Sequence, residues 1–120
     1  MRRFWIVPLL LAIAGCKGPE ENPPKAAFGD AGRGVALIAD AGCGSCHIIP
    51  GLRWARGLVG PPLDHVGRRI YIAGLLRNTP ENMVAWLRFP QRIVPGNAMP
   101  DMGLNDEEAR DIAAYLFSIE

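Results

Sequence analysis

The sequence predicts a small all-α fold, in which three main helices are joined by long loops. Its 120 residues are enough for one domain. Three segments combine helix-capping residues with apolar positions at helical spacing, and no run shows strand-like alternation or an Asn-Gly hairpin signal. Two stretches rich in glycine and proline, residues 48–67 and 91–103, lie between these segments. Loops of that length in so small a domain need a group to wrap around.

Residues 1–15 have the pattern of an export signal. Arg2 and Arg3 give a positive start, and residues 4–14 form an apolar stretch too short to cross a bilayer as a helix. Small residues follow. We therefore predict that residues 1–15 are a signal peptide that is removed after export.

Cys16 is predicted to carry lipid. The segment "IAGC" resembles the bacterial lipobox, whose cysteine becomes the first residue of the mature chain and is diacylated. The alternative is ordinary secretion, with Cys16 as a spare thiol. Stable anchoring needs two or more acyl chains, and lipidation would fix the protein to the periplasmic side of a membrane. Residues 16–28 then form an anchor and flexible tether, because this proline-rich stretch has no apolar period. Residues 29–120 form the folded domain.

Charge is nearly balanced over the chain but unevenly placed. The formal net charge is +1, and loss of Arg2 and Arg3 makes the mature chain nearly neutral. Arginines are concentrated in residues 53–92, whereas acids are concentrated in residues 101–120. A docking dipole and two solvated faces explain this pattern equally well. Dispersed arginines in an exported chain give no support to a nucleic-acid partner.

The first helix is predicted from about Asp30, as N-cap, to about Ala39. Within it, Gly34 leaves a flat surface on which another helix can pack closely.

The second helix lies in "NTPENMVAWLRFP". Thr79 is a good N-cap, Pro80 suits the first helical position, and Pro90 ends the helix. A weaker helical turn is predicted just before it, near residues 69–75.

The third helix lies in "LNDEEARDIAAYLFSI". Asn105 and Glu108 approximate a capping box, and acids in the first turn suit the helix dipole. Apolar side chains recur at helical spacing at Ile112, Tyr115, Leu116 and Ile119.

The segment "AGCGSCHIIPG" gathers Cys43, Cys46 and His47. A structural zinc site needs four ligands, so it would require these three and His65, without a second paired motif. A thioredoxin-like redox pair would need a βαβ pattern, which the sequence lacks.

The third interpretation is Cys-x-x-Cys-His as a c-type haem attachment site. Cys43 and Cys46 can each add to a vinyl group of the porphyrin, and Nε2 of His47 can then bind the iron. Export agrees with this interpretation, since c-type haem is attached outside the bacterial inner membrane. We therefore predict one covalent haem c with iron.

The second axial ligand is expected from the segment "VPGNAMPDMG". Met99 lies 52 residues after the histidine of the motif, and Pro100 biases it away from helix, so it can present its thioether from a loop. Met102 and His65 are the competing ligands. Met83 is expected to pack in the core of the second helix.

From about Gly29 to Glu120 the chain resembles a class I, mono-haem cytochrome c. The resemblance rests on "GCGSCH", "VGPPL", "NTPENMVAWLRFPQ", "PGNAMP" and "DEEARDIAAYL", which follow the order of the family. The chain is most similar to the cytochrome c domain attached to subunit II of some haem-copper oxidases. No copper-centre ligand pattern accompanies the resemblance.

The resemblance implies the small class I cytochrome c fold, with three main helices and long loops around one haem. The first and last helices would cross beside the haem, with Gly34 and Leu37 meeting Tyr115 and Leu116.

The resemblance also implies roles for residues around the haem. The carbonyl of Pro61, or less favourably Pro62, would hold the second nitrogen of His47. Trp86 would form a wall of the haem pocket, although core packing explains it equally well. Cofactor-binding residues are thus expected at Cys43, Cys46, His47, Met99, Pro61 and Trp86, with His47 and Met99 on the iron.

The predicted function is electron transfer, without enzymatic activity. His47 and Met99 would close both axial positions and raise the potential. The expected partners are redox proteins of a respiratory chain, with a haem-copper terminal oxidase as acceptor, and the chain is expected to be a monomer. The alternatives are a fixed haem subunit of a dehydrogenase complex, or a peroxidase-like haem enzyme with an open sixth position.

Overall fold

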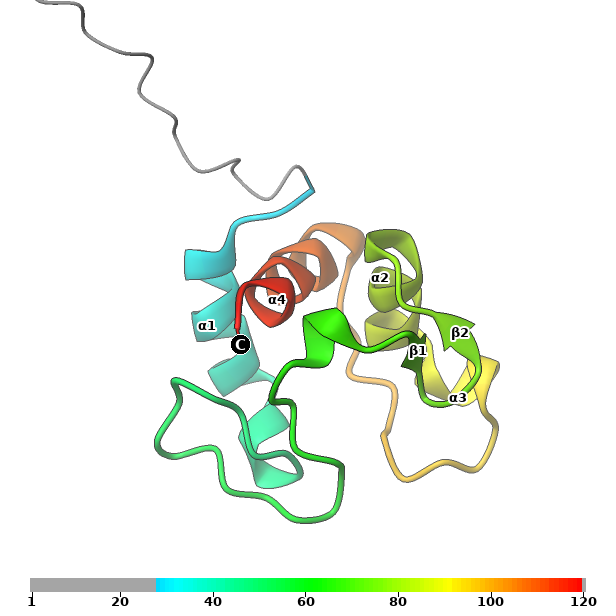
Figure 1. The fold of residues 1–120 in the computed structure, drawn as a ribbon, viewed down its shortest axis with the longest axis horizontal. Helices are drawn as coiled ribbons and strands as arrows, with labels where there is room; N and C mark the ends of the chain where they lie inside the picture. The colour runs from blue at the N-terminus through cyan, green and yellow to red at the C-terminus, as the bar shows by residue number, and fades with distance from the viewer. Residues whose placement is uncertain (1–27, 120) are drawn as a thin grey trace, which may run out of the picture.

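The computed structural model describes residues 28–119, and Figure 1 shows their arrangement. The described helices are α1 (Ala31–Asp40), α2 (Pro80–Arg88), α3 (Pro90–Ile93) and α4 (Asp106–Ser118), with two 3-10 turns, η1 (Cys43–Ser45) and η2 (Val66–Arg68). The predicted all-α class and its three main helices are confirmed. No helix among the described residues is long and apolar enough to cross a membrane. The predictions for residues 1–15, for Cys16 and for the tether up to residue 27 lie outside the described residues.

Helix α1 begins where its capping residue predicts. The Asp30 carboxylate accepts hydrogen bonds from the backbone amides of Gly32 (2.9 Å) and Arg33 (3.1 Å). These bonds satisfy two of the amides that the first turn leaves without helical partners.

Helices α1 and α4 touch through their backbones. Gly34 is buried, and a Cβ atom placed on it would lie 2.2 Å from the carbonyl oxygen of Asp111 and 3.2 Å from the amide nitrogen of Ile112. The predicted close packing at Gly34 is therefore confirmed. The contact falls about one helical turn earlier on α4 than the expected Tyr115 and Leu116, because the missing side chain of Gly34 matches the backbone at Asp111.

Helix α4 carries the predicted capping box. The side chain of Asn105 accepts from the Glu108 amide, and the Glu108 side chain accepts from the Asn105 amide, both at 2.9 Å. Three of its buried residues are alanines, Ala109, Ala113 and Ala114, which allow close approach of neighbouring helices.

Helix α2 also begins as predicted, with the Thr79 hydroxyl accepting from the Asn82 amide at 3.2 Å and Pro80 in the first turn. It ends at Arg88 because Phe89 leaves the helical conformation (φ −137°, ψ 50°). Pro90 then starts the short helix α3. The predicted loop over residues 91–103 therefore begins as a helical turn, which follows from the preference of proline for the first helical position.

The helical turn predicted near residues 69–75 is wrong. This stretch holds a two-stranded antiparallel hairpin, in which β1 (Tyr71–Ile72) pairs with β2 (Leu76–Arg77). Ala73 (φ 51°) and Gly74 (φ 70°) both take the positive φ that tight hairpin turns favour. Strands of two residues are too short to show alternation, and Ala-Gly is not the usual hairpin signal. The 3-10 turn η2 lies just before this stretch.

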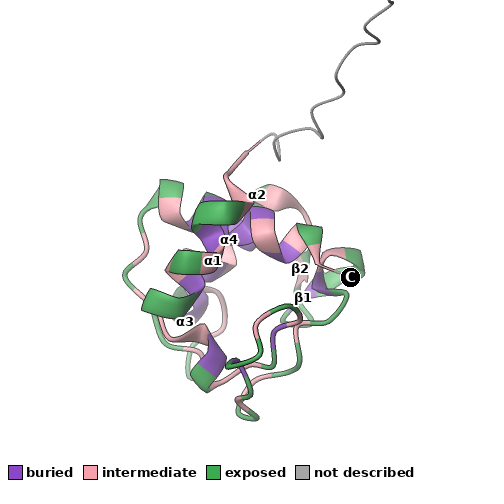
Figure 2. Cartoon of the chain, turned by 90° about the vertical axis from the view of Figure 1, so that its left-hand side faces the viewer, coloured by how far each residue is buried: buried purple, intermediate pink, exposed green. Residues whose placement is uncertain are grey.

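The core lies where α1 and α2 pack against α4, and Figure 2 shows many of the buried residues on these helices. Met83 is 2% exposed, as expected for a core residue of α2. The other large buried apolar residues of these three helices are Ile38, Val84, Leu87, Ile112 and Leu116. This helical core supports the loops that carry the candidate site.

Candidate functional site

The two cysteines of the motif lie on a 3-10 turn directly after α1. Gly42 takes a left-handed conformation (φ 72°), which reverses the chain, and the His47 amide donates to the Cys43 carbonyl at 3.0 Å. Cys43 and Cys46 are free thiols and half-buried. Burial raises the pKa of the Cys43 thiol. The turn thus presents two thiols and an imidazole within five residues.

The imidazole of His47 is held from one side. Its Nδ1 atom lies 2.7 Å from the carbonyl oxygen of Pro61, and a carbonyl can only accept, so Nδ1 carries the proton. Gly60 allows this approach, because a Cβ atom there would lie 2.3 Å from Cε1 of the ring. Nε2 is then the nitrogen left for a metal, as in metal sites whose histidines donate their other N–H to a carbonyl.

The loop between Pro61 and Asp64 is itself fixed by an arginine that the sequence did not single out. Arg69 donates to the carbonyl oxygens of Pro62 (2.5 Å) and Asp64 (3.0 Å), and its guanidinium lies 3.8 Å from the Asp64 carboxylate. The carbonyl of Pro62 therefore bonds to Arg69 and not to His47. The only sequence signal for this role is an arginine shortly after the "GPPL" segment.

Met99 lies in a loop, and both its backbone amide and its backbone carbonyl form hydrogen bonds. Its amide donates to the side-chain oxygen of Asn97 at 2.7 Å, and its carbonyl accepts from the side-chain amide of Gln91 at 2.8 Å. The same Gln91 amide donates to the carbonyl of Asn97 at 2.7 Å. The Met99 side chain is half-buried against the core. Gln91 and Asn97 thus order the methionine loop, a role that the sequence analysis missed.

The competing ligands differ in their surroundings. Met102 is half-buried, whereas Met83 is enclosed in the core and has no open side. His65 is exposed and has a positive φ of 50° at the start of η2. In Figure 1 the segment after η1 and the loop after α3 both lie below α4. Met99 and Met102, both in the loop after α3, therefore remain as the candidate thioether ligands.

Trp86 is half-buried and packs against the helical core. Its position agrees with core packing as well as with a pocket wall.

Several large apolar side chains outside the helices of the described structure are exposed. Leu58 is 84% exposed, Val59 68%, Ile70 67% and Leu75 60%. Exposed apolar side chains in loops are available to contact another apolar group. Two thiols, an imidazole nitrogen and a thioether are the donors that a covalently bound haem would use. The four-ligand zinc set is not assembled, since residues 28–119 contain no group of three or more His, Cys, Asp or Glu side chains suited to a metal ion.

Comparison with known proteins agrees with the haem that these thiols, imidazole and thioether would bind. The model of the cytochrome c family matches residues 31–120. The chain is 35% identical over 111 residues to cytochrome c oxidase subunit 2 of Alkalihalophilus pseudofirmus. This match covers 90% of this chain and 30% of that protein. The chain is 33% identical over 112 residues to the same subunit of Bacillus sp. (strain PS3), with the same coverage. For Bacillus subtilis (strain 168) the identity is 34% over 88 residues, covering 70% of this chain and 25% of the subunit.

The chain therefore spans less than a third of the length of these relatives. The similarity to oxidase subunit 2 covers most of the chain and agrees with the family match. The family implies a covalently bound haem c with its iron, and Cys43 and Cys46 have the spacing of its attachment motif. By its sequence, its mostly helical fold and its thiol–imidazole turn, this chain belongs to the cytochrome c family.

Proposed function

We propose that the protein is a lipid-anchored electron carrier on the periplasmic side of a bacterial membrane, with His47 and Met99 as the axial ligands of its haem. The observation that carries this proposal is the 2.7 Å bond between His47 Nδ1 and the Pro61 carbonyl. It leaves Nε2 free, next to two thiols at the attachment spacing. In this proposal residues 1–15 are the signal peptide, residues 16–28 are the anchor and tether, and residues 29–120 carry the haem.

Haem c supplies a one-electron couple between ferric and ferrous iron. Cys43 and Cys46 would hold the group covalently, and the Pro61 carbonyl fixes the tautomer and orientation of the imidazole of His47. The loop bonds at Asn97 and Gln91 hold Met99 in one backbone conformation. Histidine–methionine ligation raises the potential and leaves no coordination position for a substrate. These roles suit electron transfer better than enzyme chemistry.

The proposed acceptor is a haem-copper terminal oxidase. All three relatives reported above are named cytochrome c oxidase subunit 2, and the matched parts cover 70% to 90% of this chain. In this protein a lipid on Cys16 would keep the carrier near membrane-bound partners and raise its effective concentration there. A fixed haem subunit of a dehydrogenase complex is the alternative, and it would copurify with a stoichiometric partner after detergent extraction.

Replacing the proposed thioether ligand tests the closed iron site. The ferric wild type is expected to show the weak red charge-transfer band of methionine–iron ligation, and Met99→Ala is expected to lose it. The variant should also bind carbon monoxide when reduced and have a lower potential, because a soft thioether favours ferrous iron. Absorption spectra and potentiometric titration measure these changes.

The matched controls are Met102→Ala and His65→Ala, which should keep the band. A band lost in Met102→Ala and kept in Met99→Ala would identify the other methionine as ligand. Rapid carbon monoxide binding by the reduced wild type would show an open site and support the haem-enzyme alternative.

Replacing the proposed lipid acceptor tests the anchor. Cys16→Ser is expected to move the protein from the membrane to the soluble periplasmic fraction, because the acyl chains provide its membrane affinity. Its haem spectrum should stay that of the wild type, since the change lies outside the haem domain. Fractionation followed by mass spectrometry of the N-terminal peptide measures both. An unmodified Cys16 in a wild type that is already soluble would contradict the anchor.

A further inference from the structure

The loop over residues 48–56 has a defined structure. Ile48 and Arg56 form an isolated antiparallel bridge at its base, and Ile49 and Ala55 are each 2% exposed. The hydroxyl of Tyr115 on α4 donates to the carbonyl of Pro50 at 2.8 Å. The loop is thus closed at its base, packed from inside and tied to α4, so its outer side chains are presented from a fixed backbone.

This loop lies directly against the cysteine turn. A Cβ atom on Gly44, between the two cysteines, would lie 2.4 Å from the Trp54 ring and 2.8 Å from the Cα atom of Ala55. The Gly57 amide donates to the Gly44 carbonyl at 2.9 Å. Trp54 is nevertheless 51% exposed. The Cζ3 atom of the indole therefore lies against the cysteine turn, while about half of the residue is open to a partner.

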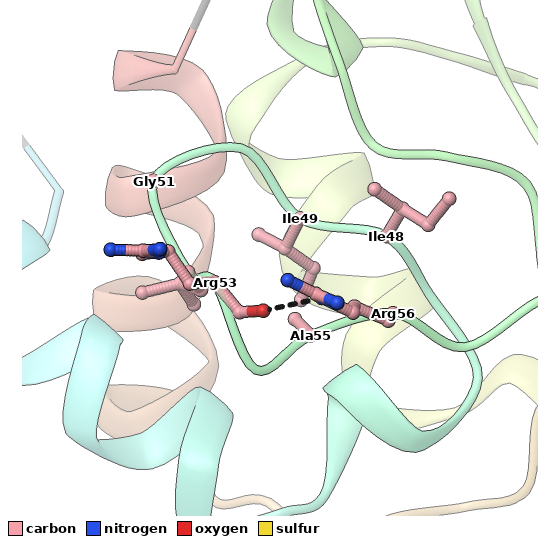
Figure 3. Close-up of a pocket in the computed structure, with 7 residues that line it drawn as sticks. Ile48, Ile49, Gly51, Arg53, Ala55 and Arg56 are labelled. Carbon is pink, nitrogen blue, oxygen red and sulfur yellow. Dashed lines mark hydrogen bonds between the residues drawn. The ribbon is translucent and has the colours of Figure 1, made fainter.

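Two arginines flank this tryptophan. Arg53 and Arg56 are exposed, and neither guanidinium has a carboxylate partner among residues 28–119. Nε of Arg56 donates a 2.8 Å hydrogen bond to the backbone carbonyl of Arg53, drawn as a dashed line in Figure 3. Other arginines of the domain, such as Arg33, Arg69, Arg88 and Arg110, do pair with carboxylates.

The same loop borders a shallow, open hollow of about 270 Å³, which the two arginines line together with apolar side chains. Its apolar lining consists mainly of Ile48, Ile49, Leu52 and Ala55. An exposed tryptophan with unpaired arginines is the composition of protein-interface hot spots. The hollow suits an apolar side chain of a partner, and the arginines suit carboxylates beside it.

We propose that residues 48–56 form the docking surface for an acidic patch on the redox partner protein. The inference rests on the proposed electron-carrier function and adds where the partner binds. Docking here would place the partner next to Trp54, which itself lies against Gly44, one of the two residues between the cysteines. A lipid surface fits the loop less well, because sequences that bind anionic lipid carry clusters of four to eight basic residues. This loop has two, and residues 28–119 contain no lysine.

The test compares two double charge reversals in the full-length holoprotein. Arg53→Glu/Arg56→Glu changes the docking loop, and Arg77→Glu/Arg92→Glu changes two other arginines that pair with rings and not with carboxylates. In Figure 1 β2 and α3, which carry the control pair, lie on the opposite side of the molecule from the loop. Both variants change the net charge equally. The measurement is the rate at which purified haem-copper oxidase oxidises the reduced carrier, over a range of salt concentrations.

The loop reversal is expected to slow this oxidation by about tenfold at low salt and to remove most of its salt dependence, as loss of complementary charges does. Trp54→Ala should slow it more than about fivefold at any salt, as loss of an interface anchor does. The control reversal should stay within about twofold of the wild type. Oxidation by a neutral quinone, the absorption spectrum and the potential should be unchanged in the loop reversal.

Equal rates for the two reversals would overturn the docking surface. So would a loop reversal that leaves oxidation by the oxidase unchanged but weakens binding of the unlipidated Cys16→Ser protein to vesicles of anionic phospholipid. If the wild type transfers no electrons to the oxidase, the proposed acceptor is wrong, a result distinct from failure of the loop. In that case the same variants assayed with the copurifying partner decide the docking surface.

Discussion

Arg69 shows how a single residue outside the attachment motif can act on the haem site. It donates hydrogen bonds to the carbonyls of Pro62 and Asp64, and so fixes the short loop whose first carbonyl, at Pro61, accepts the hydrogen bond from the Nδ1–H group of His47. The bond to Nδ1 makes the imidazole a better electron donor to a metal at Nε2. Arg69 is therefore a positioning residue in the proposed site.

Replacing Arg69 is expected to raise the reduction potential. In Arg69→Ala the loop loses two bonds, the Pro61 carbonyl moves more freely, and the weaker donor imidazole stabilises ferric iron less. One hydrogen bond contributes about 1 kcal/mol. For a one-electron couple, a tenfold change in the equilibrium constant corresponds to about 59 mV. The potential of the variant is therefore expected to change by a few tens of millivolts. Potentiometric titration measures it. Arg69→Lys should recover part of the change.

The control for this variant is Arg77→Ala, which removes a guanidinium stacked on Tyr71 and should leave the potential unchanged. A purely structural role for Arg69 would lower stability without moving the potential, and that outcome would contradict the positioning role.

Asp111 is the second residue whose role comes from the fold. It is 2% exposed, accepts from the Asp30 amide at 2.7 Å and pairs with Arg33 at 2.9 Å. A buried carboxylate needs such partners. It therefore ties the start of α1 to the middle of α4, beside the contact at Gly34.

At the scale of the elements, the crossing of α1 and α4 depends on a missing side chain. Gly34→Ala is expected to lower the free energy of unfolding by about 1–3 kcal/mol, because a methyl group would overlap the Asp111 carbonyl, 2.2 Å away. Denaturant unfolding of the holoprotein, followed by far-UV circular dichroism, measures the change.

Gly32, two residues earlier in α1, is the matched control. A Cβ atom there would meet nothing closer than the Asp30 carboxylate at 3.2 Å. Gly32→Ala should therefore be neutral or stabilise the protein by up to about 1 kcal/mol, as alanine favours helix over glycine. Equal losses in both variants would show that the cost comes from the helix itself and not from the crossing.

At the scale of the whole molecule, the helical core supports only part of the chain. The long loops leave apolar side chains such as Leu58, Val59 and Leu75 open, and a chain of this length has little other surface to bury. We therefore expect the bound cofactor to stabilise the fold, as a ligand that binds only the native state does.

Removing the attachment thiols tests this dependence. Cys43→Ser/Cys46→Ser is expected to yield little stable protein, and the protein obtained should show reduced helical circular dichroism and bind a dye that reports exposed apolar surface. Acid–acetone extraction should release any haem that remains, whereas the wild type should keep its haem. The control is Cys16→Ser, which removes a thiol outside the haem domain. A double variant as stable as the wild type would show that the helical core folds without the cofactor.

Much of this protein was determined by its sequence, because the decisive signals are local. Asp30, Thr79 and Asn105 cap helices through bonds to amides two or three residues away, so their positions predict where each helix starts. The attachment motif is equally local. Its five residues, with the order of the later segments, identify the family and its cofactor.

Only the tertiary structure decided the features that depend on residues distant in the chain. Gly34 predicts a close contact, but its partner Asp111, 77 positions later in the chain, depends on how the two helices cross. The hairpin at residues 71–77 follows from a turn of Ala73 and Gly74 that strand alternation does not reveal. Arg69, Gln91 and Trp54 likewise show their roles only once loops meet. Such contacts come from packing across the molecule, which spacing along the sequence does not encode.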